Sequence, residues 1–268
     1  MRDREPVVSG QFYPGTKSAL ARQLETLIPK QSEKRDILGA VVPHAGYIYS
    51  GTVAGSVYAA LSPGKTYILL GPNHTGAGYG FSIINCGTWS TPLGKVKINN
   101  KLATALIDRY PKFKVDEQAH AYEHSIEVQL PFLQYIAKDF DFVPVVLSTA
   151  QINEYEMCGE HIAGAIKDYG KDVVILASSD FTHYESDAQA RYKDQLAIDA
   201  ILQLDEQRLL NNIQQYNITM CGWAPIIVML VCCKKLGAKS AKLIKYQTSG
   251  DTSGDYTSVV GYAGIIVS

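Results

Sequence analysis

The sequence is poor in the features that mark secreted and membrane-spanning proteins. It has five cysteines, an odd number at irregular spacings apart from the adjacent Cys232 and Cys233, which excludes a disulfide framework. No apolar segment follows the charged N-terminus, which argues against a secretory signal. The longest apolar run, "APIIVMLVCC" at 224–233, is too short to span a bilayer. We therefore expect a protein of the reducing cytoplasm with no membrane partner.

An excess of charge of one sign is also missing. The chain has 25 Lys and Arg against 26 Asp and Glu, for a formal net charge of −1, and no basic residues cluster in the sequence. A protein without a positive patch has no field that recruits nucleic acid or an anionic membrane surface. Nucleic acid is therefore not expected among its partners.

Apolar residues, by contrast, are plentiful enough for a large core, at 46% of 268 residues. No linker, repeat or charge block divides the chain, so residues 1–268 are predicted to form one domain. Several apolar runs are β-branched and lack polar alternation, which is typical of strands buried on both faces of a sheet. The predicted strands are 37–43, 66–71, 80–85, 141–147, 172–178, 241–247 and 259–267.

Longer segments with helical spacing separate these strands. In 123–138, for example, Ile126, Leu130 and Leu133 recur on one helix face. The run 80–98 is interrupted by turn residues and suggests an inserted hairpin, and 249–258 is predicted to be a polar loop. The alternation predicts an α/β fold whose central sheet, largely parallel or mixed, has helices on both faces. The predicted helices are 17–28, 51–61, 100–109, 123–138, 152–169, 186–203 and 223–236.

Histidines follow three of the buried strands. "AVVPH" ends in His44, "YILLGPNH" in His74, and "VVILASSDFTH" in Asp180 and His183. One such histidine is usually a local hydrogen-bonding residue, but in an open α/β sheet the carboxyl ends of the strands form a shared crevice. Imidazole is the commonest protein ligand of zinc, copper, iron and nickel. The pattern predicts a metal site at this edge of the sheet.

A thiol is expected at the same site. Cys221 and Gly222 come just before the apolar helix 223–236, and a helix N-terminus favours the thiolate anion. Cys221 is thus a candidate metal ligand or nucleophile. Tyr47 and Asn73, close in sequence to the two histidines, are expected in the wall of the crevice.

A second motif offers a different interpretation. "HAYEH" contains His120, Glu123 and His124 in the H-x-x-E-H order of zinc peptidases, which requires both histidines on one helix. That hypothesis would leave the histidines at the strand ends without a role. In the alternative, Glu123, His124 and Glu127 form the polar start of a helix that lines or braces the crevice.

Five motifs, "VVPHAGYIYSG", "LLGPNHTG", "EHSIEVQLPFL", "SSDFTHY" and "MCGWAPI", occur in an order and spacing that resemble the Memo family. Its bacterial and archaeal members are also called AmmeMemoRadiSam system protein B. The resemblance runs from "GQFYPG" to the final strand. It implies a fold like that of the class III extradiol dioxygenases, which hold non-haem iron(II) with two histidines and a carboxylate.

Carried over to this chain, the resemblance implies His44, His74 and Cys221 as metal ligands, with Asp180 and His183 as the acid/base segment. His120 lies outside the motif. A thiolate in place of the carboxylate shifts the preference of the site toward copper(I) or zinc, while iron remains compatible. Ring cleavage is therefore not simply inherited.

Two functional hypotheses follow. In the first, the protein is an oxidoreductase that uses a redox metal ion, iron or copper with zinc as an alternative, and His183 moves a proton. In the second, the crevice is a binding module for a small molecule, a peptide or a metal handed onward. The family's gene neighbourhood implies a radical-SAM protein as a partner.

Overall fold

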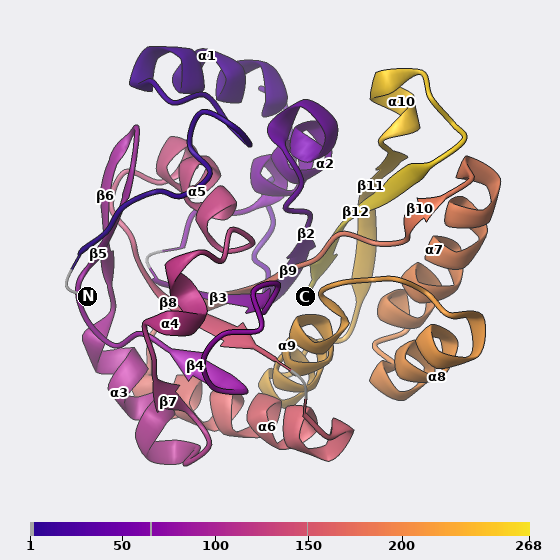
Figure 1. Cartoon of the computed structure of the whole chain (residues 1–268). Helices are drawn as coiled ribbons and strands as arrows, with labels where there is room; N and C mark the ends of the chain where they lie inside the picture. Colours follow the sequence, from indigo (N-terminus) through magenta and orange to yellow (C-terminus); the bar gives the residue numbers. More distant parts are fainter. Residues whose placement is uncertain (1–2, 65, 149) are drawn as a thin grey trace.

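Five parallel strands form the middle of a continuous mixed sheet in the computed structural model, which describes residues 3–64, 66–148 and 150–268 (Figure 1). The strand order is β1-β5-β6-β8-β3-β9-β2-β12-β10, with β6 through β2 parallel, β11 beside β12, and β4 joined to β7 and β8. The strands are β1 (Asp3–Arg4), β2 (Gly39–Val42), β3 (Thr66–Pro72), β4 (Phe81–Ile83), β5 (Thr88–Thr91), β6 (Gly94–Ile98), β7 (Lys114–Val115), β8 (Asp141–Leu147), β9 (Val173–Ser178), β10 (His183–Glu185), β11 (Ala241–Thr248) and β12 (Val259–Val267).

Helices cover both faces of this sheet, as predicted. Side chains alternate along β2 and β3, so that Val41 and Ile68 join one apolar core and Ala40 and Leu69 the other. The first core packs under α3, α6 and α9, and the second under α1, α2 and α5 (Figure 1). The helices are α1 (Lys17–Leu27), α2 (Tyr47–Ala60), α3 (Asn100–Arg109), α4 (Gln118–Ala121), α5 (Leu130–Ile136), α6 (Ile152–Tyr169), α7 (Asp187–Leu202), α8 (Glu206–Tyr216), α9 (Trp223–Leu236) and α10 (Gly250–Ser253).

The predicted helix 123–138 is wrong in its first half. Residues 122–126 are irregular, a short 3-10 helix covers Glu127–Gln129, and α5 starts only at Leu130. The apolar spacing did identify the side chains that face the core, because Ile126, Leu130 and Leu133 are all buried. Glu123 instead accepts a hydrogen bond from the backbone N–H of Ser125, a local contact that competes with helix formation. This irregular segment becomes part of the site.

Other elements also differ from the prediction. Helices α4 and α8 and the short strands β1, β7 and β10 were not predicted, and the expected loop 249–258 contains α10. The expected hairpin within 80–98 is present as the antiparallel pair β5 and β6. Among the residues that the structure describes, every helix is too short or too polar to cross a bilayer.

Candidate metal centre

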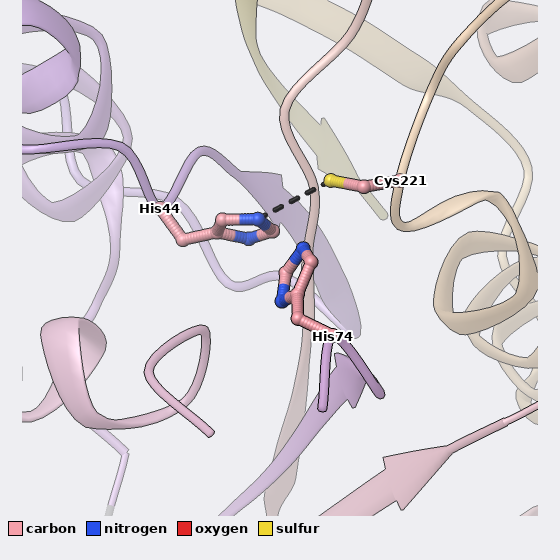
Figure 2. Close-up of side chains that lie close together, drawn as sticks. All are labelled: His44, His74 and Cys221. Atoms are coloured by element: carbon pink, nitrogen blue, oxygen red, sulfur yellow. Dashed lines mark hydrogen bonds between the residues drawn. The ribbon is translucent and has the colours of Figure 1, made fainter. Parts of the chain in front are cut away.

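The order of the central strands brings the predicted site residues together. β9 lies between β2 and β3, so the segments that follow these three strands share one edge of the sheet. His44 follows β2, Asp180 follows β9 and His74 follows β3. Cys221 approaches from the other direction, just before α9, and its sulfur points at the two imidazoles (Figure 2).

His44, His74 and Cys221 offer ligand atoms that all lie within 4.8 Å of one another. The Nε2 of His44 is 3.2 Å from Sγ of Cys221, and the centroids of the two imidazole rings are 5.1 Å apart. His44 is buried, whereas His74 and Cys221 are partly exposed. The three atoms can therefore surround one cation that enters from the exposed side.

His44 is held in one tautomer by Ser178, the last residue of β9. The Ser178 hydroxyl donates its only proton to the Ser125 carbonyl at 2.7 Å, so toward His44 Nδ1, 2.9 Å away, it accepts. Nδ1 of His44 thus carries the proton and Nε2 presents a lone pair to the cleft. Burial, together with the neighbouring His74, His124 and His183, lowers the pKa of His44 well below its usual range and keeps the ring neutral.

His74 is held by a carboxylate instead. Glu123 accepts hydrogen bonds from Nδ1 of His74 at 2.9 Å and from its backbone N–H at 2.7 Å. Burial opposes charge on both groups, but their mutual hydrogen bond and attraction prevail. The pKa of His74 is consequently raised and that of Glu123 lowered to about 2. A carboxylate behind an imidazole fixes its orientation and increases its basicity as a ligand.

The position of Cys221 depends on the glycine that follows it. A Cβ on Gly222 would lie 2.2 Å from the Ser178 carbonyl oxygen and 2.4 Å from Ser179 Cβ, so only glycine permits this close approach to the end of β9. The Asp180 backbone N–H then meets Sγ of Cys221 at 3.3 Å. Gly222 therefore allows the Cys221 sulfur to lie against the end of β9.

The expectation of a thiolate favoured by the helix terminus is wrong before metal binds. Burial, and next the charge of Asp180, raise the pKa of Cys221 far above its usual range. The thiol is therefore protonated, and its S–H points to the lone pair on Nε2 of His44.

The Asp180 carboxylate contacts the backbone of His44 rather than the imidazole ring of His44. Its Oδ1 accepts from the backbone N–H of His44 at 2.8 Å and of Ala45 at 3.3 Å, while its Oδ2 is 3.9 Å from Nε2 of His44. Burial raises the pKa of Asp180 to about 6, although these N–H groups favour the charged form. The orienting partner of the His44 ring is Ser178.

A second group of ligand atoms, from His74, Glu123 and His124, is also within 4.8 Å. Both oxygens of Glu123 already accept hydrogen bonds, from His74 and the Ser125 N–H, so this carboxylate serves as a support for His74. The His124 ring stacks on His74 with centroids 4.7 Å apart and is 5.4 Å from His44. His124 thus faces the cleft beside the imidazoles of His44 and His74.

The peptidase hypothesis is not supported by the structure. α4 ends at Ala121, so His120 and His124 do not share a helix. His120 is buried, and its Nδ1 donates to the Asp116 carbonyl at 2.8 Å. Within the described residues it belongs to neither group of ligand atoms.

Three other residues were predicted near the crevice, and the structure places each in a different environment. His183 donates its Nδ1–H to the Thr219 carbonyl at 2.8 Å, which leaves Nε2 without a hydrogen-bond partner among the described residues. Asn73 lines a cavity of about 130 Å³ together with Cys221 and Trp223. Tyr47 is buried against Phe132 in the core.

Glu127 lies on the far side of its segment, where Arg4 Nη1 meets its Oε2 at 2.7 Å. It accepts further hydrogen bonds from the backbone N–H groups of Val7 and Val8 and from the hydroxyl of Tyr13. This carboxylate fixes the N-terminal segment and does not face the imidazoles.

Sequence reasoning missed the neutral network behind His44. Gln129 donates from Nε2 to Ser178 Oγ and to the Pro43 carbonyl, both at 2.9 Å, and accepts from the Tyr58 hydroxyl at 2.8 Å. All of these side chains are buried. A polar residue that ends an apolar strand, such as Ser178, was the one available signal.

Comparison with known proteins places these observations in a family. The family model described as Memo-like protein matches residues 4–266. A MEMO1 family protein of Methanosarcina barkeri is 46% identical over 266 residues, covering 98% of this chain and 99% of its own. One from Methanosarcina acetivorans is 45% identical over the whole of both chains, and one from Methanopyrus kandleri is 42% identical over 98% of each.

A solved structure supports the fold independently. An uncharacterized protein from Escherichia coli K12 superimposes with a TM-score of 0.57 at 15% identity, covering 86% of this chain and 100% of that one. At that identity the likeness concerns the fold alone. The family assignment rests on the sequence matches, which span nearly the full chain. The chain belongs to the Memo-like protein family.

Proposed function

We propose that this protein holds a redox-active metal ion, iron or copper with zinc as the non-redox alternative, on His44, His74 and Cys221. The observation that carries the proposal is the convergence of these three ligand atoms within 4.8 Å. The donor set fits a metal, because a neighbouring group occupies Nδ1 of each imidazole, which leaves Nε2 for the cleft, and a thiol completes the set. Thiolate with two imidazoles suits copper(I) and zinc, and iron(II) is compatible with it.

We further propose that the protein is a non-haem metal-dependent oxidoreductase acting on a small molecule or peptide in the crevice. The metal would supply the redox chemistry when bound. His183 would accept or donate a proton at Nε2, because the Thr219 carbonyl occupies its Nδ1. Asp180 would hold the backbone of His44 in place. The continuous sheet supports residues 1–268 as one functional domain, and the free cysteines support a place in the reducing cytoplasm.

Metal content tests the site. Protein purified from its native host should retain about one redox metal per chain. The double variant His44→Ala, His74→Ala should lose this metal. The control variant His161→Ala should retain it, because His161 lies in α6 and stacks on Tyr110. Co²⁺ added to the metal-free protein should give a thiolate-to-cobalt charge-transfer band that Cys221→Ser lacks. Unchanged metal in the double variant would refute the assignment.

The second candidate function is a binding module, in which the crevice receives a peptide or small molecule or passes its metal to a radical-SAM partner. The partial exposure of the His74 side chain, 32%, favours it, because a ligand that is accessible from solvent can release its metal. Oxygen uptake distinguishes the oxidoreductase from the binding module. Metal-loaded protein should consume oxygen with catechol-like compounds, and His183→Ala should lower the rate. Absence of uptake with iron and with copper favours the module.

A further inference from the structure

We propose that Arg4 is a positioning residue of the metal centre: it holds segment 118–127, in which residues 122–126 are irregular, so that Glu123 keeps Nε2 of His74 turned toward the cleft. This inference rests on the proposed function for its consequence, but its structural part can be measured without metal. Arg4 lies on the edge strand β1, far from the ligands in sequence. Its side chain is nevertheless among the most buried charged groups of the described chain.

Arg4 makes an unusually complete set of contacts. Its Nε donates to the His120 carbonyl and its Nη2 to the Glu123 carbonyl, both at 2.8 Å. Its Nη1 forms the 2.7 Å ion pair with Glu127, and the guanidinium lies 4.1 Å from the centroid of the Trp89 ring. The planar, forked geometry of arginine is required for such simultaneous contacts.

These contacts replace the hydrogen bonds that a helix would have supplied. Between α4 and the 3-10 helix, residues 122–126 have no regular secondary structure, yet Glu123 and Ser125 are fully buried. Buried carbonyls require donors, and those of His120 and Glu123 are satisfied by Arg4. The conformation of the segment therefore depends on a side chain from the N-terminal strand.

The segment transmits this constraint to the metal ligand. The backbone of Glu123 is fixed by Arg4, and the carboxylate of the same residue holds both Nδ1 and the backbone N–H of His74. Displacement of the Glu123 backbone would weaken both hydrogen bonds. His74 could then adopt the other tautomer or rotate, and Nε2 would leave the cleft.

Arg4→Lys is the decisive variant, because lysine keeps the positive charge for Glu127 but cannot donate to both carbonyls in the same fork. We expect metal affinity, measured by competition with a chelator, to fall about tenfold, at the low end of the range for groups that support a metal ligand. In metal-free protein above neutral pH, ¹⁵N spectra of the His74 ring should change from the Nδ1–H tautomer to a mixture. Arg4→Gln should show larger changes in both.

Tyr13→Phe is the matched control. It removes a hydrogen bond to the Glu127 carboxylate from the same buried cluster but leaves the Arg4 hydrogen bonds to the His120 and Glu123 carbonyls in place. It should lower the melting temperature but leave metal affinity and the His74 tautomer unchanged. If the Arg4 variants behave in the same way, Arg4 has only a structural role and the inference is overturned. If the unmodified protein binds no metal, the proposed function fails, while the ring spectra still decide whether Arg4 positions His74.

Discussion

Nε2 of His44 lies 3.2 Å from Sγ of Cys221, although 177 residues separate the two in the sequence. The imidazole accepts the thiol proton because Ser178 holds its other nitrogen in the protonated form. A metal ion held by both residues would replace that proton. The proposed metal affinity should therefore depend on pH.

Metal binding should release about one to two protons per chain near neutral pH. One comes from Cys221, whose pKa is raised by burial, and a fraction of another from His74, whose pKa Glu123 raises. Because protons compete with the metal, affinity should rise with pH. Calorimetry in buffers of different ionisation enthalpy measures the release, and Cys221→Ser should release about one proton fewer. Equal release from both proteins would contradict the thiol as a ligand.

Ser178→Ala should lower metal affinity by about 10- to 100-fold, because it removes the group that fixes the tautomer of His44. It should also cost about 1–3 kcal/mol in the free energy of unfolding, since Gln129 loses a buried acceptor. Ser82→Ala is the control, as Ser82 is equally buried in β4 and bonds to Asp116. Chelator competition and urea unfolding should show loss of stability in both variants but loss of affinity only in the first.

Gly222→Ala should weaken both metal binding and folding. The added Cβ would overlap the Ser178 carbonyl, so α9 must shift and carry Cys221 away from His44. Overpacking of this kind costs about 1–3 kcal/mol. Gly159→Ala, which crowds α6 against the Val228 carbonyl of α9, should destabilise the protein similarly while the cobalt–thiolate band persists. A normal band in Gly222→Ala would show that the close approach is not needed.

Acid should destabilise the protein through His120. Burial lowers the pKa of this histidine from 6.5 to about 4, although the Asp116 carbonyl favours its charged form. Between these values the unfolded chain binds the proton and the folded one does not, so stability falls as pH decreases from 6.5 to about 4. The contribution is about 3 kcal/mol. Denaturant unfolding should show a shallower pH dependence in His120→Gln; an unaltered slope would argue against a neutral buried His120.

Much of the fold could be predicted because its signals are local. β8, β12, α3, α6 and α9 have the predicted bounds, since unbroken apolar runs and helical spacing are properties of neighbouring residues. The first half of helix 123–138 was mispredicted because Glu123 forms hydrogen bonds both with the nearby Ser125 N–H and with distant groups. Glu123 bonds to His74 and its backbone to Arg4, contacts that no local pattern records.

The sequence by itself determined which strands are buried and which side chains follow them, and so it placed His44, His74 and Asp180 at one edge of a sheet. Periodicity and chain order suffice for that, because parallel strands expose their carboxyl ends together.

Only the tertiary structure decided how each candidate ligand is held. Ser178 supports one imidazole and Glu123 the other, burial keeps the thiol of Cys221 protonated, and Arg4 reaches the segment of Glu123 from 119 residues away. The physical reason is that tautomers, pKa values and hydrogen-bond partners depend on which groups are buried together. That is fixed by packing between distant segments.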